Sequence, residues 1–153
     1  MLRSAIRPLT RTFAPAVTRP TFFRTVVTKR FTQDHEWISL DDATGTGTFG
    51  ITDYAQKNLG DVVFVELPTV DSQIAAGESI GNVESVKAVG EIYAPVSGKV
   101  KEVNEELETS PELINQDPEA EGWLAKIQLS NPGEFDALLN EQAYQALCKG
   151  EDQ

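Results

Sequence analysis

Apolar side chains recur at every second position in several short stretches of the chain. Between residues 123 and 129, for example, each alternate residue beginning with Trp123 is apolar, which is the period of a half-buried strand. Similar stretches are rich in Val, Ile, Phe and Thr and are bounded by Gly, Pro, Asp or Asn. The pattern predicts strands at 36–40, 45–51, 62–67, 79–86, 89–93, 98–103 and 123–129. Many short strands with close turns favour a mainly β fold, either a small sandwich or a flattened barrel.

Two short helical signals interrupt the strands. Thr52 is suited to cap a helix at 53–59, and Gly60 is suited to end it. Residues 110–112 are Ser-Pro-Glu, and a proline at the first helical position predicts the start of a single turn there.

The chain ends in a third helical pattern. After Asn131, apolar residues recur along one side of the segment 134–148, which predicts a C-terminal helix that packs on the sheet. No linker rich in Ala, Pro or Ser divides the chain. We therefore expect a single domain from residue 31 to 153.

The first thirty residues differ in composition from the rest. They contain seven of the 13 basic residues and no Asp or Glu, and Arg3, Arg7 and Arg11 recur at four-residue steps opposite apolar positions. A segment rich in Arg, Ser and Thr and poor in acids is typical of a mitochondrial transit peptide. The alternative is a disordered basic tail. We predict a transit peptide at 1–30, cut between residues 24 and 32.

The remainder of the chain is strongly acidic. It carries six lysines against all 24 acidic residues, so the net charge of −11 understates its acidity. Such a surface repels phosphate backbones and anionic lipid, and we expect no nucleic-acid or membrane partner and favour basic protein partners. No apolar stretch approaches the roughly 20 residues that cross a bilayer. Cys148 is the single cysteine, which excludes an intramolecular disulfide.

Familiar catalytic patterns are absent from the sequence. One histidine and one cysteine cannot supply the ligand cluster of a typical zinc site, and we expect no metal. The glycines of 45–50 lack the spacing of a dinucleotide fingerprint and fall within a strand pattern. Glu105, Glu106 and Glu108 are expected to form a solvated face.

Lys87 has an unusual position. It lies between the predicted strands 79–86 and 89–93, at the tip of a hairpin. A lysine amine on a protruding turn is reachable by a modifying enzyme. Spacing alone establishes only this accessibility, and an ordinary surface lysine remains an alternative at this point.

The residues around Lys87 resemble a known modification hairpin. Residues 83–88 (Val-Glu-Ser-Val-Lys-Ala), followed by 93–98 (Tyr-Ala-Pro-Val-Ser-Gly), are similar to the lipoyl-attachment hairpin of glycine cleavage H proteins. Other segments resemble the same family in the same order, namely 35–37, 50–55, 59–68 and 122–124. The resemblance extends from about residue 31 to about 148. It implies a lipoyl-type flattened β-barrel of two small antiparallel sheets, with short helices and a C-terminal helix.

The resemblance also implies a carrier and not an enzyme. Lys87 would bear lipoic acid in amide linkage and carry the aminomethyl group left by glycine decarboxylation. The implied partners are a pyridoxal phosphate-dependent glycine decarboxylase (P protein), a folate-dependent aminomethyltransferase (T protein), dihydrolipoamide dehydrogenase (L protein) and the lipoylating enzymes. The implied location is the mitochondrial matrix.

Three acidic residues receive roles from this resemblance. Glu84, three residues before the lysine, is a candidate recognition residue for lipoylation. Glu36 and Glu91 are candidates for a cleft that shelters the loaded arm, where either carboxylate could pair with a protonated amine. The alternative is that both are plain surface acids. Asp34 stands where the family commonly has a small hydroxyl residue.

Three other functions are alternatives to this one. A biotin carrier normally has methionines beside its lysine, whereas this chain has Val86 and Ala88. A lipoyl domain of a ketoacid dehydrogenase acyltransferase would continue through linkers into a catalytic domain. An acidic β-domain that only binds proteins, with Lys87 unmodified, is the remaining alternative.

Overall fold

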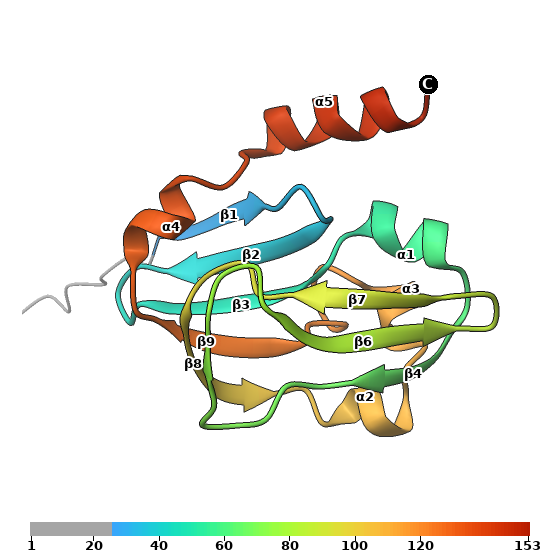
Figure 1. Ribbon diagram of the computed structural model, residues 1–153, viewed down its shortest axis with the longest axis horizontal. Coiled ribbons are helices and arrows are strands. Elements are labelled where there is room, and N and C mark those ends of the chain that lie inside the picture. The colour runs from blue at the N-terminus through green and yellow to red at the C-terminus, as the bar shows by residue number, and fades with distance from the viewer. Residues whose placement is uncertain (1–25) are drawn as a thin grey trace, which may run out of the picture.

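The structure is a computed structural model that describes residues 26–153, so most of the predicted transit peptide lies outside the described residues. The described chain forms two antiparallel sheets, one of six strands and one of three, with short helices around them (Figure 1). This arrangement confirms the predicted mainly β, two-sheet fold. None of the helices in residues 26–153 has both the length and the apolar character needed to cross a membrane.

All seven predicted strands are present, with small changes at their ends. The strands are β1 (Val27–Phe31), β2 (Glu36–Asp41), β3 (Thr46–Ile51), β4 (Val62–Glu66), β5 (Gln73–Ile74), β6 (Ser79–Ser85), β7 (Val89–Tyr93), β8 (Gly98–Val103) and β9 (Ala125–Leu129). The helices are α1 (Asp53–Leu59), α2 (Glu106–Thr109), α3 (Leu113–Gln116), α4 (Pro132–Asp136) and α5 (Glu141–Glu151). The larger sheet has the order β1-β2-β3-β9-β8-β5, and the smaller has the order β4-β6-β7.

The core lies between the two sheets. Ile38 and Phe49 from the larger sheet and Val83 from the smaller one are fully buried. Each buried side chain of this size contributes about 1.5–3 kcal/mol relative to an exposed one. Because strand residues alternate between faces, the neighbours of Val83 along β6 point outward, away from this core. The smaller sheet thus has one buried face and one face directed at solvent.

The N-terminal side of the domain contains an unpredicted strand. Strand β1 pairs with β2 along its length, with Val27 opposite Asp41 and Phe31 opposite Trp37. It begins inside the predicted cleavage range of 24–32. The two-residue strand β5 was also not predicted, because it is too short to show a period.

The C-terminal helix differs from the prediction. The single helix expected at 134–148 is two helices, α4 and α5, and the prediction of one continuous helix was wrong. Leu139 between them exchanges two backbone hydrogen bonds of 2.9 Å with Phe31, which takes this segment out of helical geometry. Asn140 then caps a new helix by accepting a hydrogen bond from the Ala143 amide.

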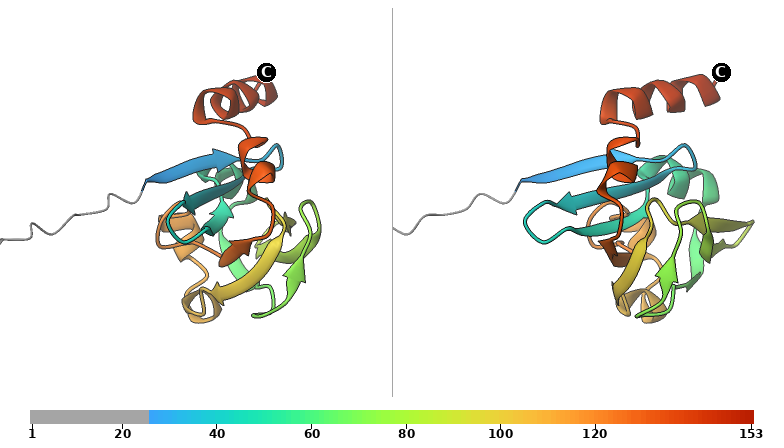
Figure 2. Two further views of the ribbon diagram at one scale, coloured as in Figure 1. Left: turned by 90° about the vertical axis from the view of Figure 1, so that its left-hand side faces the viewer. Right: turned by 60° about the vertical axis from the view of Figure 1, so that its left-hand side comes forward.

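Tyr144 is the buried residue of helix α5 and packs it against the domain. The Tyr144 ring stacks on Phe31 at 4.5 Å between centroids, and its hydroxyl lies 2.6 Å from Thr52 Oγ1 and 2.8 Å from His35 Nδ1. Burial is the main cause that raises the pKa of this phenol. Figure 2 shows α5 beside β1, away from the β6–β7 hairpin. The helix therefore leaves that hairpin uncovered.

The acidic segment after β8 also departs from the prediction in detail. The single turn expected at 110–112 is replaced by two short helices, with Ser110 at the end of α2 and Glu112 immediately before α3. The predicted solvated acids of this region, Glu105, Glu106 and Glu108, are exposed as expected.

Candidate functional site

Lys87 lies at the tip of the β6–β7 hairpin and is exposed. The Ser85 hydroxyl oxygen accepts hydrogen bonds from the amides of Lys87 (3.2 Å) and Ala88 (3.0 Å). The Ser85 amide donates to the Ala88 carbonyl at 2.8 Å. These bonds fix a two-residue turn in which Lys87 projects, and they satisfy amides that the strand ladder leaves unpaired.

The loop that follows α1 braces this turn from behind. The Val86 amide donates to the Asp61 carbonyl at 3.1 Å. Gly60 has a φ of +84°, and a Cβ built on it would lie 3.4 Å from Lys87 Cε. The bare backbone of Gly60 therefore leaves room for the stem of Lys87 to lie against the loop.

Asn115 on α3 holds the same loop in place. Its amide nitrogen donates to the Gly60 carbonyl at 2.9 Å and to Gln56 Oε1 at 3.0 Å. Its amide oxygen accepts from the Val62 amide at 2.9 Å. One side chain thus connects α1, α3 and β4 and indirectly positions the tip that carries Lys87.

We expect Asn115→Ala to lower the free energy of unfolding by about 2 kcal/mol, because it leaves partly buried groups of Gly60 and Val62 without partners. Urea unfolding followed by circular dichroism measures this change. Gln142→Ala, at an exposed position on α5, is the control and should change stability by less than about 0.5 kcal/mol. Equal stability of the two variants would contradict the assigned role of Asn115.

A cavity of about 220 Å³ lies between the smaller sheet, α1 and the larger sheet. We call it the β7 cavity. Its walls include the apolar residues Ile51, Ala55, Leu59, Val83 and Ile92 and the acids Asp34, Glu36 and Glu91. Leu59 in its wall directly precedes Gly60, against which the stem of Lys87 lies. The path from the hairpin tip to the cavity is therefore short.

Glu36 is the buried acid of this cavity, with 1% of its surface exposed. Its carboxylate accepts hydrogen bonds from the Thr32 hydroxyl and, at 3.2 Å, from the Tyr93 amide. Burial raises the pKa of Glu36, these hydrogen bonds oppose the increase, and the nearby Asp34 charge adds to it. A positive charge placed beside this carboxylate would oppose the effect of burial and favour its ionised form.

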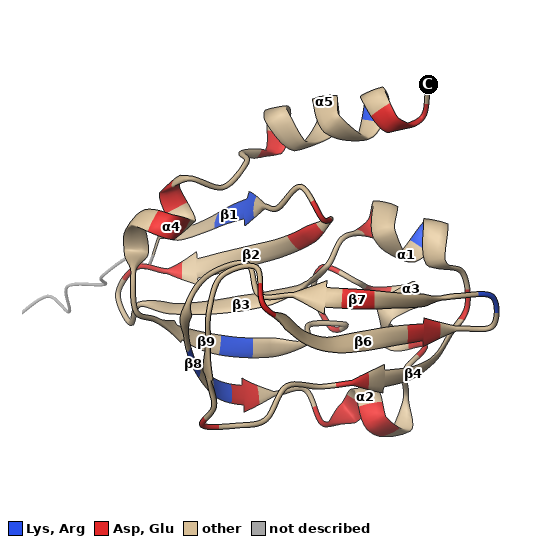
Figure 3. Ribbon diagram, in the orientation of Figure 1, with Lys and Arg blue, Asp and Glu red and all other residues tan. Residues whose placement is uncertain are grey.

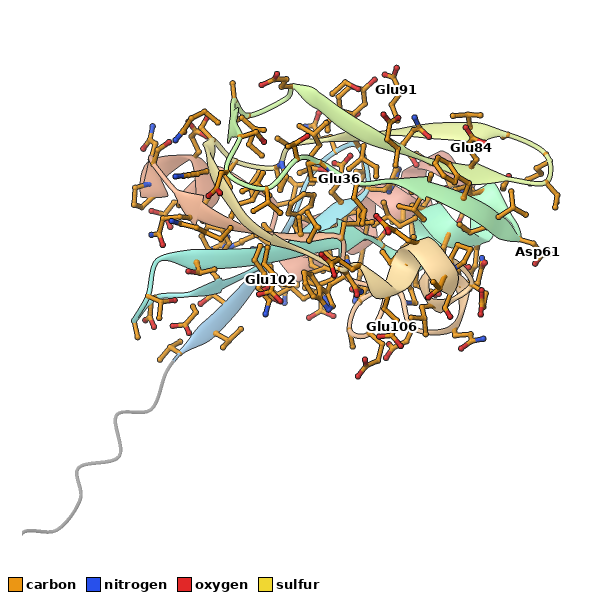
Figure 4. All side chains as sticks on the ribbon, turned by 90° about the horizontal axis from the view of Figure 1, so that it is seen from below. Glu36, Asp61, Glu84, Glu91, Glu102 and Glu106 are labelled. Atoms are coloured by element: carbon orange, nitrogen blue, oxygen red, sulfur yellow. The ribbon has the colours of Figure 1, made fainter. Side chains whose placement is uncertain are left out.

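Glu91 lies at the rim of the cavity. Its carboxylate accepts a hydrogen bond of 2.7 Å from the Tyr93 hydroxyl, and this contact raises the pKa of Tyr93. Figure 4 shows Glu91 and Glu84 on the outer side of the smaller sheet, with Glu36 beneath that sheet. The structure thus places Glu36 and Glu91 around the same cavity, Glu36 inside and Glu91 at its edge. Glu84 lies apart from both.

The local sequence around Ser85, Gly60 and Asn115 predicts no functional role for these residues. A serine two residues before the tip of a hairpin is a recognisable turn signal. Gly60 was predicted only to end a helix, and nothing local links it to Lys87. Asn115 is distant in sequence from everything it holds. Only the fold could identify these last two roles.

Comparison with known proteins agrees with this geometry. The family model described as glycine cleavage H-protein matches residues 29–151. The chain belongs to the glycine cleavage H-protein family. The glycine cleavage system H protein of Thermotoga maritima is 54% identical over 123 residues, which are 80% of this chain and 98% of that protein. A Schizosaccharomyces pombe relative, described as a mitochondrial H protein, is 50% identical over 125 residues, which are 82% of this chain and 73% of that protein.

A solved structure of the H-protein family supports the same conclusion. The crystal structure of an H protein from Mycobacterium marinum is 41% identical and superposes with a TM-score of 0.71, covering 77% of this chain and 94% of that one. The two-sheet fold is therefore that of the H proteins. This H-protein family member is a lipoyl carrier of the glycine cleavage system, and it is a carrier subunit rather than a catalytic one.

Proposed function

We propose that Lys87 is the residue that carries the lipoyl group of this H protein. The proposal is supported mainly by the position of the lysine on an exposed, hydrogen-bonded turn, with the lysine stem against Gly60. Lys87 forms no ion pair with any residue in the described range 26–153. Conversion of its amine into an amide would therefore break no such pair in this part of the chain.

The surroundings of Lys87 fit a lipoyl group. The β7 cavity has mainly apolar walls, which suit an aliphatic chain, and it lies next to the Gly60 loop. When bound, the group supplies a dithiolane that accepts the aminomethyl unit and two electrons. The protein positions the arm and shields its end from water.

We further propose that Glu36 and Glu91 serve the loaded arm. A protonated amine inside the β7 cavity would meet the buried Glu36 carboxylate, and the Glu91 carboxylate at the rim adds a second negative charge. A charge-assisted contact in a shielded cavity is stronger than one in water. Asp34 lines the same cavity and adds to its negative charge. Glu84, on the outer side of β6, is proposed as a recognition residue for lipoylating enzymes.

The partner enzymes and the cellular location are part of the same proposal. The specific partners are glycine decarboxylase, the aminomethyltransferase, dihydrolipoamide dehydrogenase and the lipoylating enzymes. The mitochondrial matrix as the location is supported by the basic, acid-free residues 1–30 and by the S. pombe relative described as mitochondrial. Because β1 begins at Val27 and pairs along its length with β2, a cut before Val27 would keep that strand whole.

Reconstitution tests the proposed function. Purified protein, with and without enzymatic lipoylation, is mixed with the three partner enzymes, glycine, tetrahydrofolate and NAD⁺. We expect glycine-dependent NADH formation only with the lipoylated protein. The proposal would be contradicted if unmodified protein gave the same rate of NADH formation. It would also be contradicted if protein shown by its mass to be lipoylated gave no NADH. Total inactivity of the lipoylated form would favour the alternative, a protein-interaction module.

A further inference from the structure

The outer face of the smaller sheet carries two rows of side chains beside Lys87. The strand register aligns Phe64, Glu84 and Val89 across β4, β6 and β7, and we call this set the phenylalanine row. Two residues further along, the register aligns Glu66, Asn82 and Glu91, which we call the asparagine row. Both rows face away from the core, because Val65, Val83 and Gly90 between them lie on the inner face.

The phenylalanine row exposes apolar surface next to the hairpin tip. Phe64 is 52% exposed and Val89 is 63% exposed, and the nearby Val63 and Val86 are exposed as well. Large apolar side chains gathered in one exposed place beside a functional group indicate a contact with another molecule. Their position on both sides of Glu84 gives this contact an acidic centre.

The asparagine row borders a hollow of about 300 Å³. Asn82 Nδ2 donates to Glu66 Oε2 at 2.5 Å. Because an ionised carboxylate only accepts hydrogen bonds, the amide nitrogen must face Glu66, and Asn82 Oδ1 points elsewhere. This oxygen is shielded from solvent and accepts no hydrogen bond from any residue between 26 and 153. The ionised groups of the hollow, on Glu66 and Glu91, are both negative.

No basic residue balances these acids within the sheet. Strands β4, β6 and β7 contain no Lys or Arg, and Figure 3 shows acidic positions on them and a basic position at the tip that joins β6 and β7. Lys87 lies in this tip, between the two strands. Conversion of Lys87 to an amide would remove that remaining positive charge. The modified form of this face would then be more negative than the unmodified form.

We propose that the phenylalanine and asparagine rows together form the docking face for an enzyme that acts on the arm of Lys87. That enzyme places a basic side chain in the hollow of the asparagine row and an apolar surface on Phe64 and Val89. Arginine fits best, because its planar guanidinium offers several donors to the carboxylate oxygens of Glu66 and Glu91. This inference rests on the proposed function and adds to it the chemistry of the partner.

The distances along β6 suit this role. A strand rises about 3.3 Å per residue, so Glu84 lies roughly 10 Å and Asn82 roughly 17 Å from Lys87 along the strand. A partner centred on these rows therefore has the base of the arm beside it without covering the lysine. The negative charge also favours a basic protein surface over nucleic acid or anionic lipid.

Binding measurements on the lipoylated protein test the docking face. Wild type, Glu66→Gln and Glu66→Lys are titrated by calorimetry into the aminomethyltransferase and, separately, into glycine decarboxylase from the same organism. Glu66 does not line the β7 cavity, so these variants leave the arm cavity intact. The control is Glu106→Gln, an equal charge change at an exposed residue on α2, which Figure 4 shows on the side of the molecule opposite Glu84 and Glu91.

We expect Glu66→Gln to weaken binding at least tenfold for one or both enzymes, because it removes one charge-assisted contact. Glu66→Lys should weaken binding further. Glu106→Gln should stay within twofold of wild type. Raising the ionic strength should weaken the binding of wild type more than the binding of Glu66→Lys. Intact mass and thermal unfolding confirm that all variants are equally lipoylated and folded.

The possible results separate this inference from the proposed function. If both Glu66 variants bind each enzyme as tightly as wild type does, the proposed docking face is wrong and the carrier role stands. The same holds if Glu106→Gln loses as much affinity as Glu66→Gln. If lipoylated wild type binds neither enzyme, both proposals fail. If sedimentation shows a wild-type dimer that Glu66→Lys dissociates, the face belongs to a second copy of the chain and the inference is overturned.

Discussion

Lys87→Arg should abolish lipoylation and glycine cleavage while the fold is unchanged. Arginine keeps the positive charge on an exposed turn that makes no ion pair in residues 26–153, but its guanidinium cannot form the lipoyl amide under enzymatic conditions. Glycine-dependent NADH formation with the three partner enzymes measures the loss, which should reach the background rate. Mass spectrometry of the same sample should show no lipoyl group.

The matched control is Lys101→Arg, the same change at another exposed lysine, on β8. It should retain full lipoylation and activity. Thermal unfolding should give the same midpoint for both variants and the wild type, because neither side chain contributes to the core. Retained activity in Lys87→Arg would refute the carrier site at this residue.

Glu36→Gln should have the second largest effect, on the stability of the loaded arm. It keeps the shape of the buried side chain and its contacts with Thr32 and Tyr93, but it removes the negative charge. If that charge pairs with the amine of the loaded arm in the β7 cavity, its loss should speed hydrolysis of the loaded form about tenfold, corresponding to one charge-assisted hydrogen bond. Formaldehyde and ammonia release from protein loaded by the decarboxylase measures this rate.

The same variant should change how stability depends on pH. Burial raises the pKa of Glu36 above 4.5 in the folded protein, so the folded state holds this proton more strongly than the unfolded state. The free energy of unfolding contributed by Glu36 therefore falls as pH rises from about 4.5 through the folded pKa. The loss is about 1.4 kcal/mol for each pH unit by which the pKa is raised.

Glu36→Gln should consequently be more stable than wild type at pH 7, and this advantage should disappear below pH 4.5. Urea unfolding at several pH values measures it. A variant that hydrolyses the loaded arm faster while gaining stability would show that the buried charge is retained for function. Unchanged hydrolysis would remove Glu36 from the arm cavity, and lower stability at pH 7 would contradict the assigned cause of its raised pKa.

Local pattern was sufficient for much of the fold. Alternation of apolar residues predicted β9 and its neighbours, and the capping residue Thr52 and the terminator Gly60 predicted the bounds of α1. The hairpin tip at Lys87 followed from the two strands beside it. These features depend on interactions between residues close in sequence, which pattern and capping rules describe.

The parts that could not be predicted depend on contacts between distant residues. The break between α4 and α5 arises because Leu139 pairs with Phe31, more than a hundred positions earlier. Likewise, the stem of Lys87 lies against Gly60, and the Gly60 loop is held by Asn115. Resemblance suggested Glu36 as a cleft residue. Its burial and its contact with the Tyr93 amide depend on how the two sheets pack.

The most direct test of the central claim is the intact mass of the protein purified from its native cells, followed by peptide mapping around Lys87. We predict a mass increase equal to lipoic acid minus water, located on Lys87, together with an N-terminus between residues 24 and 32. An unmodified Lys87 in protein from cells that lipoylate their other carrier proteins would contradict it and would favour the protein-interaction module instead.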